Sequence, residues 1–230
     1  MRILITTLFL AGCSGAHAQA PAPVAVELFT SQGCSSCPPA DAVMGKLARE
    51  PGVVAITRPV TYWDRLGWKD TLAQPANTAL QQAYTGRKIP GAGNYTPQMV
   101  IDGRSGAVGG QEAKVRQLIG AAQRQPHPSL SIAPGGGKVA LAGKPAAATD
   151  VVLVAMRRSV VVPIGTGENG GRKITYANVL VSERSLGNWA GGAASLVIPA
   201  AARAVPKADR YAVLVRQAGG GPILAARYLN

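Results

Sequence analysis

The sequence predicts an α/β layer domain over residues 24–125, followed by an all-β, sandwich-like domain over residues 130–230. In the first region, apolar runs of strand length alternate with segments whose apolar residues recur at helical spacing. In the second region the helical period disappears, and short β-rich runs recur between clusters of glycine and proline. Residues 126–129, where prolines flank His127, are expected to link the two domains.

Each element of the first domain has a local signal. Three runs have the composition of strands: 24–29, 53–60 and 97–102. After the first run, the apolar residues of 40–48 share one helical face, which places Asp41 on another face. Asp70 is positioned to cap a helix that runs towards Tyr84. An Asp-Gly pair after the third run predicts a hairpin turn, and a last amphipathic helix covers 115–122. The order β-α-β-α-β-β-α indicates an α/β layer domain.

The second domain is expected to consist of strands alone. Its β-rich runs are 130–133, 138–141, 151–156, 174–181, 195–198, 211–215 and 223–228. About seven short strands within about a hundred residues are typical of a β-sandwich or a partly open barrel.

The N-terminal segment, residues 1–18, has the three parts of a secretory signal peptide. Arg2 gives a basic start, residues 3–11 form a short apolar core, and residues 16–18 form an A-x-A cleavage site. A second route is open, because the stretch LAGC resembles the lipobox of bacterial lipoproteins, in which Cys13 would carry a lipid anchor. Both routes predict a periplasmic or secreted protein, and we expect cleavage after Ala18.

The formal net charge of +13 could suggest a nucleic-acid partner. The basic residues are scattered, however, and aromatic residues are few, so we expect a solvated cationic surface and no nucleic acid. We also expect no transmembrane span after the signal. The best candidate, residues 151–164, is interrupted by Arg157 and Arg158.

The chain has three cysteines, and two of them, Cys34 and Cys37, form a C-x-x-C motif between a strand and a helix. A structural disulfide, a metal site and a redox dithiol are all open. A zinc site lacks a second pair of ligands, because His127 is the only histidine after residue 18. A bridge within C-x-x-C closes so short a loop that it constrains the unfolded chain little, which favours redox chemistry.

The helix start makes one of these cysteines a good nucleophile. Unsatisfied N–H groups and the positive end of the helix dipole stabilise a thiolate there, and can lower a thiol pKa from about 8.5 to roughly 3.5–7.5. We expect Cys34 to be the exposed, attacking sulfur and Cys37 to be buried and to resolve the mixed disulfide. Pro38 and Pro39 are tolerated only close to the helix start.

Residues 24–125 resemble the thioredoxin superfamily. The resemblance rests on strand, C-x-x-C and helix in that order, and on YTPQMVIDG, residues 95–103. It implies a cis-proline at Pro97, at the start of the third core strand and against the dithiol, with Thr96 offering backbone hydrogen bonds to substrate. An ordinary edge-strand proline is the alternative.

A narrower resemblance spans nearly the whole mature chain. The stretches VELFTSQGCSSCPPAD, YWDRLGWKD, TPQMVIDG and GENGGRKITYANVL resemble a family of exported bacterial thioredoxin-like proteins with no assigned activity. It supports two domains and supplies no substrate. The chain departs from thioredoxins at Leu28, where they carry a buried acid. Glu27 is one residue earlier, on the other face of the strand, so we expect it at the surface.

Two loops are candidates for the surroundings of the dithiol. Tyr62, Trp63 and Asp64 follow the second strand, where Tyr62 and Trp63 would form an aromatic wall and Asp64 a polar orienter or proton acceptor; a purely structural loop is the alternative. Residues 165–171 contain G-x-G-x-x-G, but a strand pattern follows, which argues against a nucleotide site. We expect a hairpin there, whose Glu168 and Asn169 could cover the active-site face.

The sequence therefore predicts a thiol-disulfide oxidoreductase that needs no cofactor and acts on a disulfide-bearing protein or a small thiol. Two alternatives stay open. The dithiol could bind a soft metal ion such as Cu(I), although no histidine ligand is evident near it. The protein could also be an envelope interaction protein in which the dithiol is dormant.

Overall fold

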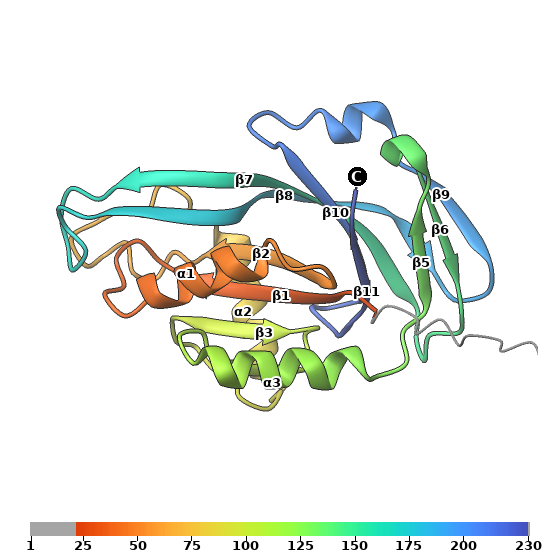
Figure 1. Ribbon diagram of the computed structural model, residues 1–230, viewed down its shortest axis with the longest axis horizontal. Coiled ribbons are helices and arrows are strands. Elements are labelled where there is room, and N and C mark those ends of the chain that lie inside the picture. The colour runs from red at the N-terminus through yellow and green to blue at the C-terminus, as the bar shows by residue number, and fades with distance from the viewer. Residues whose placement is uncertain (1–21, 230) are drawn as a thin grey trace, which may run out of the picture.

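The computed structural model describes residues 22–229 and has a mixed α/β fold with one large sheet, one small sheet and three helices (Figure 1). The predicted signal peptide at residues 1–18 and the alternative lipid anchor at Cys13 lie outside the described residues.

The N-terminal half has the predicted order of elements. They are β1 (Val24–Thr30), α1 (Pro38–Leu47), β2 (Val53–Pro59), α2 (Pro75–Gly86), β3 (Gln98–Ile101), β4 (Ser105–Val108) and α3 (Glu112–Gln123). Val26 and Leu28 of β1 pack on α1 and α3 through a cluster that includes Met44 and Val115, while α2 lies on the other face. Both faces of β1 are therefore covered.

The C-terminal half of the described chain contains seven strands, as predicted, and two short 3-10 turns that were not predicted. The strands are β5 (Ser129–Ile132), β6 (Lys138–Ala142), β7 (Thr149–Pro163), β8 (Lys173–Trp189), β9 (Ala194–Val197), β10 (Arg210–Gln217) and β11 (Ile223–Tyr228). β7 and β8 form a long antiparallel hairpin that extends to one end of the molecule (Figure 1).

The strands of the two halves share one sheet, which the sequence did not predict. The eight-stranded sheet has the order β11-β10-β7-β8-β2-β1-β3-β4, and the small sheet has the order β5-β6-β9. The junction is the parallel pairing of β2 with β8 at Thr57 and Val179. β8 is long enough to pair with β7 and still cover the free edge of β2, which satisfies backbone groups that would otherwise lie unpaired. The division at 126–129 stays a prediction, but the second half is no free-standing β-sandwich in its strand pairing.

The small sheet packs on the C-terminal part of the large one. Leu141 of β6 and Trp189 of β8 belong to one apolar cluster with Leu153 of β7 and Val213 of β10. A second cluster joins Ile56 of β2 to strands β7, β10 and β11. These contacts fix the β7–β8 hairpin relative to β1 and α1, so its far end is held beside the C-x-x-C motif.

Candidate active site

The two cysteines lie where β1 ends and α1 begins, and they form a disulfide with Cα atoms 5.4 Å apart. The N–H of Cys34 donates to the carbonyl of Ser31 (3.2 Å), and the N–H of Cys37 donates to the carbonyl of Cys34 (3.1 Å). Cys37 is the N-cap of α1, and Pro38 and Pro39 follow at the helix start, where missing N–H groups cost least. The predicted order of strand, C-x-x-C and helix is confirmed.

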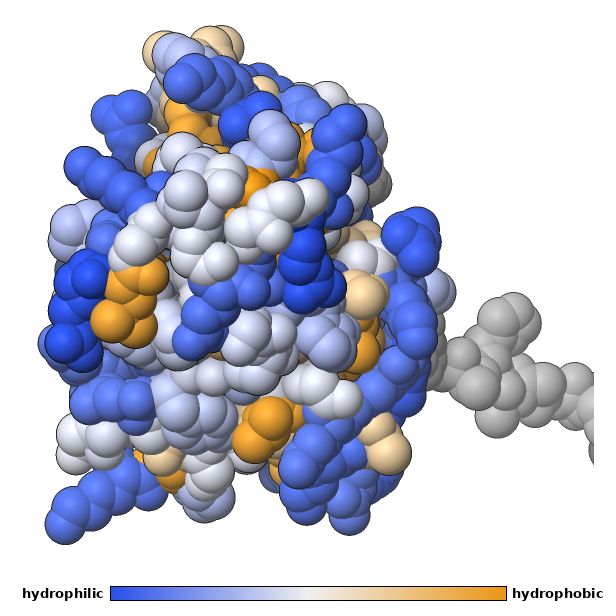
Figure 2. All heavy atoms as spheres, turned by 90° about the vertical axis from the view of Figure 1, so that its left-hand side faces the viewer, coloured by the Kyte–Doolittle hydropathy of each residue, from blue (hydrophilic) through white to orange (hydrophobic). Residues whose placement is uncertain are grey.

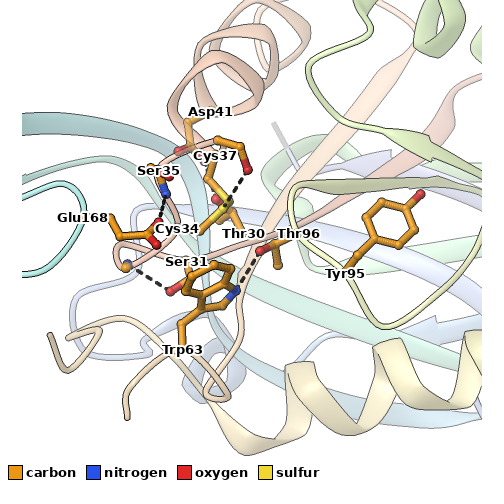
Figure 3. The surroundings of a disulfide bond; sticks show 12 residues. Thr30, Ser31, Cys34, Ser35, Cys37, Asp41, Trp63, Tyr95, Thr96 and Glu168 are labelled. Carbon is orange, nitrogen blue, oxygen red and sulfur yellow. Dashed lines mark hydrogen bonds between the residues drawn. A yellow bond between two sulfur atoms is a disulfide. The ribbon is translucent and has the colours of Figure 1, made fainter. Parts of the chain in front are cut away.

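The peptide bond between Thr96 and Pro97 is cis, as the resemblance implies. β3 begins at the next residue and lies between β1 and β4, so Pro97 does not start an edge strand. The indole N–H of Trp63 donates to Oγ1 of Thr96 (2.8 Å). Figure 3 places both side chains beside the disulfide. The aromatic wall expected from Trp63 is thus tied to the residue that precedes the cis-proline.

Tyr62 and Asp64, which were predicted to join Trp63 beside the dithiol, contact other parts of the chain. Tyr62 packs with Trp63 against a cluster that contains Phe29, and burial raises the pKa of its hydroxyl. Asp64 accepts a hydrogen bond from the backbone N–H of Asp70 (3.1 Å). This contact closes the loop after β2 and supports the structural interpretation of Asp64.

Asp70 and Trp68 tie the same loop to the chain just before Cys34. The carboxylate of Asp70 accepts a hydrogen bond from the N–H of Gln32 (2.8 Å), and the indole N–H of Trp68 donates to Oε1 of Gln32 (2.8 Å). The prediction that Asp70 caps a helix is wrong, because α2 begins at Pro75, whose fixed φ suits a first helical position. Asp70 instead shapes the approach to the cysteines.

The turn between β7 and β8, residues 164–172, covers the C-x-x-C motif from the C-terminal half. Oε2 of Glu168 accepts a hydrogen bond from the N–H of Ser35 (3.0 Å), as Figure 3 shows. The side-chain amide of Asn169 donates to the carbonyls of Gln32 (3.0 Å) and Cys34 (2.8 Å). The expectation that Glu168 and Asn169 cover this face is confirmed.

Both cysteines are fully buried, each with 0% of its surface exposed. The expectation that Cys34 is exposed is therefore wrong for this disulfide form. Its exposed neighbours are Ser35 and Ser36, and the hydroxyl of Ser36 lies 3.4 Å from Sγ of Cys34. The physical reason is the cover of the β7–β8 turn, which no local sequence signal around the cysteines reveals.

Asp41 is a site residue that the sequence pattern missed. It lies one helical turn after Cys37, whose carbonyl accepts its N–H (3.1 Å), and only 2% of it is exposed. Oδ1 accepts a hydrogen bond from the hydroxyl of Thr30 (2.9 Å), and among the described residues Oδ2 has no partner. Burial raises the pKa of this carboxyl to about 8, the bond from Thr30 opposes the rise, and the nearby carboxylate of Asp70 adds to it.

An acidic residue in the first turn is common in exposed helix starts because it complements the helix dipole, so the residue type alone gave no signal. Its position four residues after Cys37 was the available hint. In Figure 3, Asp41 lies at the Cys37 end of the disulfide. A neutral, buried carboxyl at this place can exchange a proton with a neighbouring thiol near neutral pH.

A family model described as "Protein of unknown function (DUF1223)" matches residues 25–216. The chain belongs to the DUF1223 family. Comparison with curated proteins found no match.

Solved structures extend this result. The DUF1223 chain is similar to a protein of Agrobacterium tumefaciens with a TM-score of 0.77 and 32% identity, over 92% of this chain and 96% of that one. It is also similar to HBP35 of Porphyromonas gingivalis with a TM-score of 0.53 and 14% identity, over 91% of this chain and 75% of that one. The second likeness concerns the fold alone.

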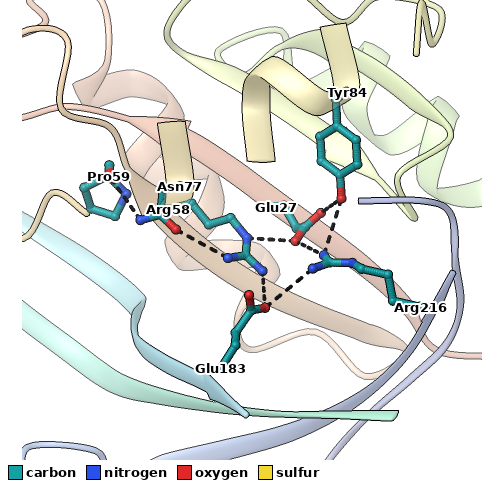
Figure 4. A network of polar contacts seen from close by, with 7 residues as sticks. All are labelled: Glu27, Arg58, Pro59, Asn77, Tyr84, Glu183 and Arg216. Atoms are coloured by element: carbon teal, nitrogen blue, oxygen red, sulfur yellow. Dashed lines mark hydrogen bonds and ion pairs between the residues drawn. The ribbon is translucent and has the colours of Figure 1, made fainter. Parts of the chain in front are cut away.

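The DUF1223 chain also holds a buried network of charges on the other face of β1 (Figure 4). Glu27 is 0% exposed and pairs with Arg58 (2.7 Å) and with Arg216. Arg58 and Arg216 also contact Glu183 on β8, and the hydroxyl of Tyr84 donates to Glu27. The expectation of a surface Glu27 is wrong, because α2 and the C-terminal strands cover this face and two arginines compensate the buried charge.

Binding of a soft metal ion by the two cysteines stays an open alternative. The described part of the chain contains no group of three or more His, Cys, Asp or Glu side chains that could hold a metal ion. The two ring nitrogens of His127 lie 2.9 Å and 3.0 Å from the carbonyl oxygens of Leu224 and Ala122. Within residues 22–229, no helix has the length and apolar character to cross a membrane.

Proposed function

We propose that this DUF1223 protein is an exported, periplasmic or secreted thiol-disulfide oxidoreductase with a thioredoxin-like N-terminal half. One observation carries the proposal: the Cys34–Cys37 disulfide lies at the N-terminus of α1 beside the cis Thr96–Pro97 bond. Strand order β2-β1-β3-β4, with α1 and α3 on one face and α2 on the other, supports the same fold assignment.

The exchange proceeds in two steps. In the reduced protein, the Cys34 thiolate attacks one sulfur of a substrate disulfide, and the other substrate sulfur leaves as a thiolate. Cys37 then attacks Cys34, which restores the Cys34–Cys37 disulfide and releases the second substrate thiol. Two electrons pass from the protein to the substrate. The same steps in reverse oxidise a dithiol substrate.

Asp41 supplies a proton acceptor for the second step. Cys37 is buried and must lose its proton before it attacks, since the thiolate is the nucleophile. With a pKa of about 8, this carboxyl is ionised in a minority of molecules at pH 7 and in about half of them near pH 8; the ionised form takes the proton, and the neutral form returns it in the reverse direction. The role follows from its place one turn after Cys37 in α1.

The proposed substrate contacts surround the sulfurs. Trp63 and Thr96 lie on one side of the disulfide, and the turn with Glu168 and Asn169 covers another. Because Cys34 is fully buried, a substrate must displace part of this cover before the first attack. The exposed turn, held to Ser35 by one side-chain bond and to two carbonyls by Asn169, is the part we expect to move.

Equilibration with glutathione buffers of graded redox potential tests the proposal. The superfamily range of roughly −270 to −120 mV is the expected result. The Cys37→Ser variant should accumulate a mixed disulfide with a model substrate, while Cys34→Ser should not, because only the first retains the attacking sulfur. A potential below about −300 mV together with no exchange would mean that the disulfide is structural.

A further inference from the structure

A groove with a strongly basic lining runs along α1. It has a volume of about 550 Å³ and lies between α1 and the strands β7 and β8. Five of its lining side chains are cationic: Arg49, Arg158, Arg172, Lys173 and Arg210. The first follows the C-terminal end of α1, the next three belong to the β7–β8 hairpin, and the last belongs to β10, so the cations converge from segments far apart in the sequence.

The basic lining continues in a second hollow beside the first. That hollow has a volume of about 510 Å³, shares Arg49, Arg158 and Arg210 with the groove, and adds Arg227. Its one acidic lining residue, Glu50, is already paired with Arg116 on α3 (2.8 Å). The two hollows form one elongated trough, which we call the α1 trough.

The positive charge of the α1 trough is not balanced by carboxylates. Among the described residues, none of its six cationic side chains takes part in a salt bridge. The only acid in the first groove, Asp41, is buried with a pKa of about 8, so it is largely neutral at pH 7.

The contacts that the cations do make include one carboxylate, Asp209, which lies near Arg158 and Arg210 and offsets part of their charge. Arg210 donates to the carbonyl of Ala48 (3.1 Å) and lies over the ring of Tyr228 (3.7 Å). The carboxylate of Asp209 accepts the backbone N–H of Arg158 (2.6 Å), and its carbonyl accepts a bond from the guanidinium (3.5 Å). Neither is an ion pair with a side-chain cation.

One end of the α1 trough lies at the dithiol. Pro38, the residue after Cys37, lines the groove together with Arg172. Arg172 donates to Oδ1 of Asn169 (2.8 Å), and Asn169 in turn holds the carbonyl of Cys34. A polypeptide attached to Cys34 can therefore continue directly into the trough.

We propose that the α1 trough binds an extended, acidic polypeptide segment next to the disulfide of a substrate protein, which rests on the proposed function. The six cations are spread along the trough, which suits a row of carboxylates better than a single small anion. They line a hollow, which a flat membrane surface does not enter. The one aromatic ring in the trough, Tyr228, is covered by Arg210, so no stacking face is offered to nucleic-acid bases.

The surface at the active-site end agrees with recognition by charge. Figure 2 shows that face as mostly hydrophilic, with small separate apolar spots in place of one continuous patch. Large exposed apolar side chains are few in the described chain: Leu66, Val108, Val161 and Val197. An apolar docking surface of the usual size is thus not offered there.

The test uses two peptides that share one internal disulfide and differ in a flanking run, of glutamates in one and glutamines in the other. In the full-length Cys37→Ser protein at low salt, we expect Cys34 to form the mixed disulfide about tenfold faster with the glutamate peptide. The triple substitution Arg49→Gln, Arg158→Gln and Lys173→Gln should remove this preference, so that the two peptides form the mixed disulfide at about the same rate. The control Lys114→Gln, Arg124→Gln and Lys138→Gln removes the same charge outside the trough and should keep it.

A second arm separates this inference from the proposed function. A fluorescent glutamate peptide without cysteine is titrated into the Cys34→Ser, Cys37→Ser double variant, and binding is followed by anisotropy. Binding that the trough substitutions abolish supports the trough even if no peptide undergoes disulfide exchange. Equal rates for the two peptides in the unsubstituted trough, an equal loss in the control triple variant, or binding of phosphatidylglycerol vesicles or single-stranded DNA in place of the peptide would overturn it.

Discussion

Asp41 and Glu27 are both buried carboxylic acids close to the central strand β1, yet their environments differ in one respect. Asp41 has a single hydroxyl partner, Thr30, and burial raises its pKa to about 8. Burial would also raise the pKa of Glu27, but the charges of Arg216 and Arg58 outweigh it, and the pKa is lowered. Burial therefore sets the cost of a charge, and the neighbouring cations decide whether the group carries one.

This difference assigns the two acids to separate tasks. Glu27 stays ionised and joins β1 to β8 and β10 through the two arginines, which is a structural use of charge. Asp41 is neutral over much of the accessible pH range and lies beside Cys37, which suits proton transfer. The thioredoxin resemblance directs attention to β1 for a buried acid, whereas the structure offers the suitable carboxyl on α1.

Breaking the buried ion network around Glu27 should have the largest effect on the stability of the protein. Arg216→Ala leaves Glu27 and Glu183 with one buried arginine between them, and we expect the free energy of unfolding to fall by about 3–5 kcal/mol. Arg116→Ala is the matched control, because that arginine also contacts two carboxylates but on the surface. Guanidinium denaturation of both variants measures the difference. Equal losses would mean that the buried network is not more important than the exposed one.

Removing the titratable carboxyl group of Asp41 should change how the stability of the protein depends on pH. The folded-state pKa of Asp41, about 8, lies above its ordinary value of 3.8, so the folded protein holds a proton that the unfolded chain releases. Its contribution is present below about pH 4 and is lost as the pH rises to about 8. Asp41→Asn should flatten this decline, by a few kcal/mol across the window. Urea denaturation from pH 4 to 9 checks it, and an unchanged slope would contradict the raised pKa.

The hydroxyl that touches Asp41 should have a smaller effect. Thr30→Val removes the hydrogen bond that opposes the rise in the Asp41 pKa, so the pKa should rise further and about 1 kcal/mol of stability should be lost. Thr57→Val is the control, since its hydroxyl donates to the neutral carbonyl of Ala177 (2.6 Å). Both variants should lose stability, but only Thr30→Val should move the pH at which stability declines.

The smallest expected change concerns Glu168. Its carboxylate accepts the N–H of Ser35 next to Cys34, and a negative charge there disfavours a thiolate. Glu168→Gln should lower the pKa of the reduced Cys34 by a fraction of a unit, which the pH dependence of iodoacetamide alkylation in the Cys37→Ser background measures. Glu50→Gln, in the turn beyond the C-terminal end of α1 and far from the sulfurs, should leave that pKa unchanged.

The local part of this structure was predictable because local signals determine it. Strand and helix order, the helix start at the two prolines, and the cis bond at Pro97 follow from short-range patterns or from the family resemblance. The burial of Cys34, Asp41 and Glu27 could not be predicted, because it depends on which distant segment covers each residue. Periodicity assigns a residue to a face of an element and says nothing about what lies on that face.

The junction between the two halves could not be predicted for the same reason. The pairing of Thr57 with Val179 joins strands that lie far apart in the chain, and each strand pattern is satisfied by any suitable neighbour. The arginines of the buried network were likewise ordinary basic residues in the sequence. Only the shared sheet brings Arg58 and Arg216 to the same carboxylate.

The β2–β8 junction has a consequence for synthesis of the chain. β2 leaves the ribosome with its neighbour β1, but its other edge finds its partner only after about 120 further residues have been made. At ordinary translation rates this interval is on the order of ten seconds. During it, an apolar strand edge is free to pair with other nascent chains. A truncated polypeptide that ends before β8 would keep that edge open permanently, so we expect it to need a holding chaperone to stay in solution.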